Sequence, residues 1–184
     1  MINPALLRPK VMEALNENYR QNNPKGVQIQ GFMGAESYKK FLAAIAKVNF
    51  RKAEIRDMYS YFEAQSPAMN FFSSKEFLSF AAAVTGKKPK AANCSLRIFM
   101  AGCYTLLHDE AADKKGAEFY FDLTPQLSAK SGGEIIYLTK EGQKLMIPPS
   151  PNMLVLAGSG RSYVKHVNHL AGDKGRLVVY GLIK

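Results

Sequence analysis

The sequence predicts an α+β protein in which a helix-rich first half supports a β-rich second half. Before residue 90, apolar residues recur at helical spacing in three segments. Beyond residue 93, short segments rich in β-branched and aromatic residues are separated by Gly, Pro, Asn and Asp, and no helical period interrupts them. The length of 184 residues is typical of one domain. We therefore expect a single domain, 1–184, in which a mixed lead-in, 1–92, packs on a β core, 93–184.

The elements of the first half follow from apolar spacing and from the residues that interrupt it. Ser73 and Ser74 are suited to cap the start of the third helix, and Gly86 is suited to end it. The pattern over 50–62 is mixed, with a strand favoured. The expected elements are helices over 4–20, 35–48 and 77–84, and strands over 27–32 and 50–62.

The second half reads as a series of short strands. The expected strands are 95–107, 117–123, 133–138, 144–147, 153–156, 163–167 and 176–183. Seven short strands at this spacing are typical of a sandwich or a barrel. Their number, and the lack of helices between them, argue against a doubly wound α/β sheet.

Composition excludes several other classes of protein. Apolar residues make up 47% and charged residues 22%, which argues against disorder, collagen and coiled coil. The net charge of +10 suggests an acidic or nucleic-acid partner, but residues 1–60 and the remainder each contribute +5, so there is no basic tail. No apolar run approaches a membrane span and the start does not resemble a secretory signal, so we expect a cytoplasmic protein with no membrane partner. Cys94 and Cys103 are expected to be reduced.

The three histidines suggest a metal site. His108 is followed by Asp109 and Glu110, and in an extended backbone His108 and Glu110 lie on one face. A third ligand from a later strand, His166 or His169, would complete a set of two imidazoles and one carboxylate. That set suits Fe(II) with three positions open. The alternative is a solvated pair of residues at a strand end, and Asp109 would compete as a ligand if the backbone bulges there.

One basic residue begins the last strand. Arg176 precedes the apolar run Leu-Val-Val-Tyr-Gly-Leu-Ile. A lone guanidinium at such a place suits a bound carboxylate through two parallel hydrogen bonds. An exposed arginine at a strand edge is the alternative interpretation.

The order of these residues resembles the Fe(II)/2-oxoglutarate-dependent dioxygenases, and within them the prolyl-hydroxylase-like branch. The resemblance covers roughly residues 70–183 and includes the helix that leads to Gly86. The resemblance implies a double-stranded β-helix, a jelly-roll-like barrel whose mouth holds iron. The segments that carry it are His108-x-Glu110, Gly132-Gly133-Glu134, Ile147-Pro148-Pro149, Pro151-Asn152-Met153-Leu154-Val155-Leu156, His166 and Arg176.

The resemblance also implies a site and an activity. His108, Glu110 and His166 would bind Fe(II), Arg176 would hold the distal carboxylate of 2-oxoglutarate, and Tyr104 could donate a hydrogen bond to this co-substrate or pack as a strand tyrosine. His166 is preferred to His169 because the second histidine and the basic residue lie about ten positions apart in this family. The activity would be hydroxylation of a protein or peptide side chain, prolyl first, with release of succinate and CO2. Ascorbate is a further candidate cofactor.

Three departures from the family pattern limit this transfer. Glu110 stands where the family usually has Asp. Val178 replaces a serine that assists carboxylate binding in some relatives, and no further arginine follows Arg176, which disfavours the DNA-alkylation-repair branch. Two other functions remain open: a non-catalytic β-barrel binding module, and a basic nucleic-acid-binding protein, which the even spread of charge does not favour.

For one predicted strand, either of two faces could point into the barrel. In 117–123, alternate residues form two sets, one apolar and one with two acids. Because a buried acid without a partner is costly, we expect the apolar set to face the barrel interior. The sets are Ala117, Phe119 and Phe121, and Glu118, Tyr120 and Asp122.

Overall fold

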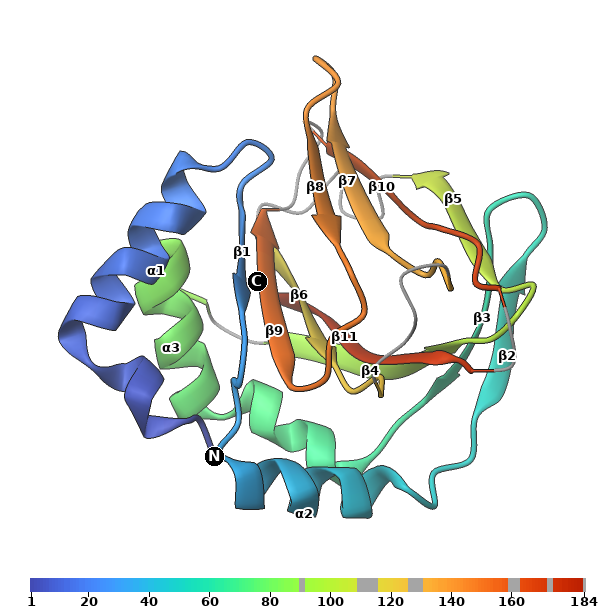
Figure 1. The fold of residues 1–184 in the computed structure, drawn as a ribbon. Helices are drawn as coiled ribbons and strands as arrows, with labels where there is room; N and C mark the ends of the chain where they lie inside the picture. The colour runs from blue at the N-terminus through green and yellow to red at the C-terminus, as the bar shows by residue number, and fades with distance from the viewer. Residues whose placement is uncertain (90–91, 109–115, 126–130, 159–162, 172–173, 184) are drawn as a thin grey trace.

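A computed structural model describes residues 1–89, 92–108, 116–125, 131–158, 163–171 and 174–183. The helices lie in the first half, as the apolar spacing predicts (Figure 1). None of the helices in these ranges is long and apolar enough to cross a membrane. The helical elements are the 3-10 helix η1 (Pro4–Leu7), α1 (Pro9–Gln21), α2 (Ala35–Ile45), the 3-10 helix η2 (Pro67–Ser73) and α3 (Lys75–Thr85).

The strands form one antiparallel sheet that curves into a nearly closed barrel (Figure 1). Its order is β1-β9-β6-β11-β4-β3-β5-β10-β7-β8, with β2 paired to β3. The strands are β1 (Gly26–Ile29), β2 (Arg51–Ile55), β3 (Tyr59–Ala64), β4 (Ala92–Phe99), β5 (Tyr104–His108), β6 (Ala117–Asp122), β7 (Ile135–Thr139), β8 (Lys144–Ile147), β9 (Met153–Gly158), β10 (Tyr163–Val167) and β11 (Arg176–Ile183).

The core of the barrel has two walls of four strands. One wall has the order β9-β6-β11-β4 and the other has the order β5-β10-β7-β8. Strands from β4 to β11 that follow each other in the chain therefore alternate between walls, except for the hairpin of β7 and β8, which lies in one wall. This interleaving is the double-stranded β-helix. Strand β3 joins the walls by pairing with both β4 and β5. The predicted fold class, an α+β protein with a jelly-roll-like barrel and supporting N-terminal helices, is confirmed.

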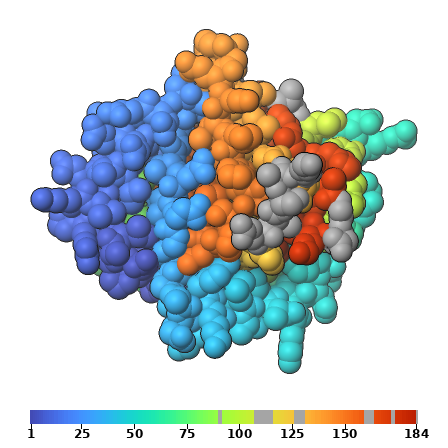
Figure 2. All heavy atoms as spheres, in the orientation of Figure 1, coloured from blue at the N-terminus to red at the C-terminus, as the bar shows by residue number. Residues whose placement is uncertain are grey.

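Side chains of the lead-in help to close the barrel at its other edge. Strands β1 and β8 stand at opposite ends of the strand order, yet Gln28 donates through Nε2 to the carbonyl oxygen of Met146 at 3.1 Å. Gln30 makes a similar contact with the hydroxyl of Ser150 at 3.1 Å. In the space-filling view the light-blue N-terminal segment and the orange segment of β8 and β9 lie side by side across this face (Figure 2).

Most predicted boundaries agree with the structure, and three segments divide. The predicted helix over 4–20 is the 3-10 helix η1 followed by α1. The predicted strand 95–107 is two strands, β4 and β5, joined by a tight turn in which Cys103 N donates to Met100 O at 2.9 Å. The mixed segment 50–62 is the hairpin of β2 and β3. The predicted caps of α3 are present: Ser74 Oγ accepts from Phe77 N at 3.3 Å, and Gly86 has a φ of +69°. Cys94 and Cys103 are free thiols, as expected.

The face of β6 that points into the barrel is the acidic one, so that prediction was wrong. Ala117, Phe119 and Phe121 pack against the helices instead, in one aromatic core with Phe77. Tyr120 packs in the second core, inside the barrel. Both faces are buried because the acids have partners from other strands, Lys165 for Glu118 and Arg176 for Asp122.

Candidate active site

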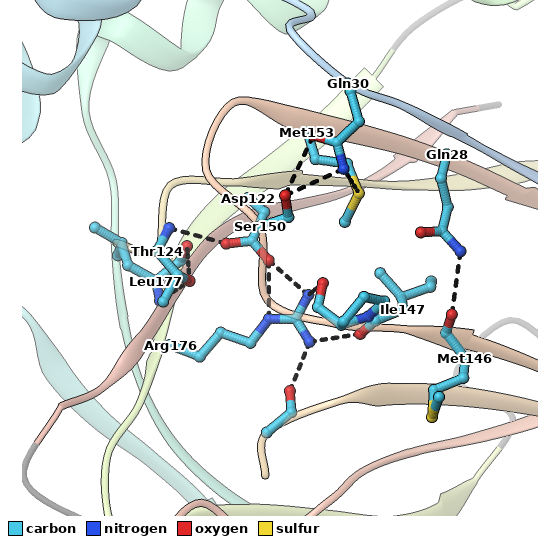
Figure 3. A network of polar contacts seen from close by, with 12 residues as sticks. Gln28, Gln30, Asp122, Thr124, Met146, Ile147, Ser150, Met153, Arg176 and Leu177 are labelled. Atoms are coloured by element: carbon cyan, nitrogen blue, oxygen red, sulfur yellow. Dashed lines mark hydrogen bonds and ion pairs between the residues drawn. The ribbon is translucent and has the colours of Figure 1, made fainter. Parts of the chain in front are cut away.

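An ion pair between Arg176 and Asp122 fills one region of the barrel interior (Figure 3). Both side chains are 0% exposed. Asp122 Oδ2 accepts from Arg176 Nε at 3.0 Å and from Nη2 at 2.6 Å, while its Oδ1 accepts from Thr124 N at 2.8 Å. The carboxylate is therefore paired and hydrogen-bonded, the condition for a charge to be buried.

Backbone carbonyls take the other donors of Arg176. Nη1 donates to Gly133 O at 2.5 Å and to Ile147 O at 3.0 Å, and Nη2 makes a longer contact of 3.5 Å with Pro148 O. A guanidinium has five N–H donors. The two contacts with Asp122 and the three with backbone carbonyls account for all five. The predicted carboxylate anchor is therefore buried, and its donors are directed at protein acceptors.

Two of the segments that carried the family resemblance meet around this guanidinium. Gly133 and Ile147-Pro148 contribute the carbonyls described above. Gly132 has a φ of +70°, and a Cβ there would lie 2.2 Å from the carbonyl oxygen of His169, so only glycine fits. Asn152 bonds the lead-in instead: its Oδ1 accepts from Met33 N and its Nδ2 donates to Met33 O, both at 2.9 Å. These motifs therefore stabilise the barrel.

A second buried network lies further along the interior. Lys165 Nζ contacts Glu118 Oε2 at 2.5 Å and Tyr180 Oη at 3.0 Å, and Tyr137 donates its hydroxyl to the same Glu118 oxygen at 3.1 Å. Burial, and then the charge of Glu118, raise the pKa of Tyr137 well above its ordinary value. Tyr137 therefore stays protonated and remains a hydrogen-bond donor.

Arg97 on β4 is held through the faces of its guanidinium. The carbon Cζ lies 4.0 Å from the ring centre of Tyr180 and 4.5 Å from that of Tyr61. Arg97 also lines a small cavity inside the barrel, with His166 and Lys165. The other lining residues are Phe99, Thr105, Tyr120, Ile135 and Val167.

The hydrogen bonds around His166 leave one ring nitrogen as an acceptor. Asn168 Nδ2 donates to Glu134 Oε2 at 3.0 Å, which turns Asn168 Oδ1 toward His166. His166 Nε2 lies 3.1 Å from that oxygen and so carries the proton. His166 Nδ1 is buried and has no hydrogen-bond partner among the described residues. An imidazole with one buried ring nitrogen left without a hydrogen bond, oriented through its other nitrogen by a second residue, fits a metal ligand.

The structure describes only part of the predicted metal set. The backbone of His108, at the end of β5, pairs with Lys165 on β10, so it lies on the strand next to His166. Asp109 and Glu110 lie outside the described residues. Among the side chains that are described, no three His, Cys, Asp or Glu gather to hold a metal. The assignment of His108, Glu110 and His166 stays a prediction.

Two other predicted residues lie apart from this cavity. His169 is exposed and does not line it. Tyr104 is half-buried, and its neighbour Thr105 lines the cavity instead. Sequence reasoning missed Arg97, although it is the one basic residue of its strand. It also missed Lys165, the one lysine of β10.

Comparisons with known proteins identify the fold. No family model matches the sequence, and no curated protein matches it. A solved prolyl-4-hydroxylase from Pseudomonas putida has a TM-score of 0.75 at 14% identity, covering 94% of this chain and 98% of that one. A 2OG-Fe(II) oxygenase family oxidoreductase from Burkholderia pseudomallei has a TM-score of 0.76 at 11% identity, covering 94% and 90%.

A third solved structure has a peptide bound. The prolyl hydroxylase from Trichoplax adhaerens, in complex with a fragment of the hypoxia inducible factor oxygen degradation domain, has a TM-score of 0.75 at 16% identity, covering 95% of this chain and 90% of that one. The chain therefore has the fold of the 2-oxoglutarate- and iron-dependent oxygenases, as the sequence resemblance predicts. A non-heme epimerase that depends on α-ketoglutarate shares it too, with a TM-score of 0.70 at 14% identity and coverage of 96% and 81%, so the fold serves more than one reaction.

Proposed function

We propose that this protein is an Fe(II)- and 2-oxoglutarate-dependent oxygenase with His108, Glu110 and His166 as metal ligands. The observation that carries the proposal is the buried acceptor nitrogen of His166, whose tautomer is set by Asn168. It lies on the strand paired with the one that ends at His108, inside a barrel of the oxygenase fold. Burial without a hydrogen-bond donor is costly for an imidazole nitrogen unless another group uses its lone pair.

Fe(II) with 2-oxoglutarate supplies oxidation of an unactivated C–H bond by O2, with release of succinate and CO2. The chain's residues would position these groups and exclude water from them. Tyr120, Tyr137 and Tyr180 line the interior with aromatic rings, and each is 4% exposed or less. Asn168 would keep the His166 ring in one orientation while a metal binds.

The substrate class that we propose is a protein or peptide side chain, with prolyl as the first candidate. The support is the sequence resemblance and the structural neighbour that carries a peptide. The net charge of +10 favours an acidic peptide. Ascorbate is proposed as an accessory cofactor, to be tested by the number of turnovers with and without it.

An anaerobic titration tests the metal site. Adding Fe(II) and 2-oxoglutarate should give a weak charge-transfer band in the visible, and a hundredfold excess of ligand over its Kd should stabilise the fold by about 2.7 kcal/mol. His166→Ala should lose both effects, and the matched variant His169→Ala should keep them. No band and no stabilisation in the unaltered protein would refute the proposal.

Turnover tests the substrate class. Succinate release should rise when acidic, proline-containing peptides are added, and matched peptides with alanine in place of proline should give only the uncoupled background. Equal release from both sets would refute the prolyl assignment and leave the oxygenase proposal intact.

The occupied donors of Arg176 favour a second candidate, a non-catalytic barrel that binds a partner. A barrel that has lost its co-substrate site can keep such an arginine for stability alone. The same titration separates the two, because the non-catalytic barrel gives neither the band nor the stabilisation.

A further inference from the structure

A groove lies along helix α3, apart from the barrel interior. Its volume is about 480 Å³, within the range of about 300–1,000 Å³ that is usual for ligand clefts. It shares no lining residue with the cavity that contains His166. Whatever binds in this groove therefore binds outside the candidate active site.

The floor of the groove is one face of α3. Lys75, Leu78, Ser79 and Ala82 follow each other at offsets that place them on one face of a helix, and all four line the groove. Leu78 and Ala82 are half-buried. A surface helix usually carries charged residues on its outer face, but α3 has none beyond its first turn. The floor is therefore uncharged and partly apolar.

The charged residues that line the groove are two lysines, Lys75 at the start of α3 and Lys88 beyond its end. Both are exposed, and neither makes a hydrogen bond or an ion pair with another described residue. Glu76 is not part of the lining, and its Oε1 accepts from the Met1 ammonium at 2.8 Å and from Ile2 N at 3.0 Å. The groove therefore has a positive potential with no acid on its wall.

The chain around the groove adds to this positive charge. Residues 64–96 contain four lysines and one acid, Glu76. Lys87 precedes Lys88, and its pKa is lowered by burial and then by the charge of Lys25. Positive charges are thus gathered at the end of α3, where an anionic partner would relieve their repulsion.

Hydrogen bonds fix both ends of the groove. Ser73 lies at one end, and its hydroxyl donates to Ala92 O at 2.8 Å. At the other end, Lys87 N donates to Thr85 Oγ1 at 3.3 Å, and the Lys87 ammonium donates to Gly116 O at 2.5 Å. The walls are therefore in place before a ligand arrives, which lowers the entropy cost of binding.

We propose that this groove binds an acidic peptide segment of a partner protein. Carboxylates of the segment would pair with Lys75 and Lys88, and an apolar side chain between them would pack on Leu78 and Ala82. A second copy of this chain fits less well, because each copy carries a net charge of +10. Nucleic acid would match the lysines but leave the apolar floor unused. The proposal does not depend on the oxygenase function, since the groove and the cavity are separate.

The test measures the binding of a fluorescein-labelled peptide in which a leucine is flanked on each side by two glutamates. Anisotropy gives its Kd for the full chain without added metal or 2-oxoglutarate. The groove variant is Lys75→Glu/Lys88→Glu, and circular dichroism checks that it is folded. The matched control, Lys140→Glu/Lys144→Glu, makes the same change of charge at two exposed positions of the β7–β8 hairpin, on the other wall of the barrel.

The expected result separates docking from general attraction to a basic protein. The groove variant should bind the peptide about tenfold or more weakly, because two charge-assisted contacts are lost, and the control should change the Kd by less than about threefold. A peptide with serine in place of leucine should bind the unaltered protein about fivefold or more weakly, because the floor no longer buries an apolar side chain.

Three outcomes would overturn the proposal. Equal losses in the groove variant and the control, or equal affinity for the two peptides, would leave only attraction to the net charge. A labelled single-stranded oligonucleotide that binds more tightly than the peptide, and less tightly to the groove variant, would assign the groove to nucleic acid. Failure of the unaltered protein to bind the leucine peptide would also overturn the proposal, with the oxygenase function intact.

Discussion

The ion pair between Arg176 and Asp122 should be among the largest single contributions to stability in the barrel. Arg176→Met would leave the Asp122 carboxylate, 0% exposed, with Thr124 N as its one remaining hydrogen-bond partner in the described structure. Removing one partner of a buried pair costs about 3–5 kcal/mol. Asp122→Leu should cost about the same, because it leaves the Arg176 guanidinium buried without its carboxylate.

The double variant Arg176→Met/Asp122→Leu should be more stable than either single variant. It buries no charge, and its main loss is the donors to the carbonyls of Gly133 and Ile147, about 1 kcal/mol each. The losses in unfolding free energy of the two single variants sum to about 6–10 kcal/mol, whereas the double variant should lose about 2–3 kcal/mol. The coupling energy between the two residues is therefore about 3 kcal/mol or more.

Urea unfolding followed by far-ultraviolet circular dichroism measures these free energies, since the chain has no tryptophan. If a single variant is unfolded without urea, Arg176→Lys and Asp122→Asn provide a milder cycle. Single effects that add to within about 0.5 kcal/mol would refute the ion-pair argument.

Three further predictions concern other parts of the molecule. Asn168→Leu should lower Mn(II) affinity by about 10- to 100-fold in a calorimetric titration, because the His166 ring loses the partner that sets its tautomer; unchanged affinity would contradict that role. Ser74→Ala should lower the free energy of unfolding in urea by about 1 kcal/mol, because α3 loses its cap. Ser79→Ala, at an exposed position on the same helix, should lower it less. Equal losses would argue against the cap. Burial raises the pKa of Cys94 to about 11, so its thiol should react slowly with a disulfide reagent at pH 8 in the folded protein. The free energy of unfolding should fall as the pH rises from 9 through 11, because the unfolded chain loses this proton first. Rapid labelling at pH 8 would contradict the shift.

The regular elements were predictable because their signals are local. Strands 144–147, 163–167 and 176–183 have the predicted bounds, since alternation and turn residues act over a few positions. The division of 95–107 was missed because Gly102, with a φ of +80°, makes a turn inside an otherwise strand-like segment. The candidate site was predictable only through the joint order of its motifs, since each residue alone had a structural alternative.

The periodicity of apolar residues in the sequence therefore established the α+β class, the order of most strands, and the strand that carries His166. It could not establish which face of β6 points inward or what Arg176 binds. Those outcomes depend on charges that meet across the barrel, Glu118 with Lys165 over 47 positions and Asp122 with Arg176 over 54. A buried acid is unfavourable until its cation is beside it, and the folded chain alone brings the two together.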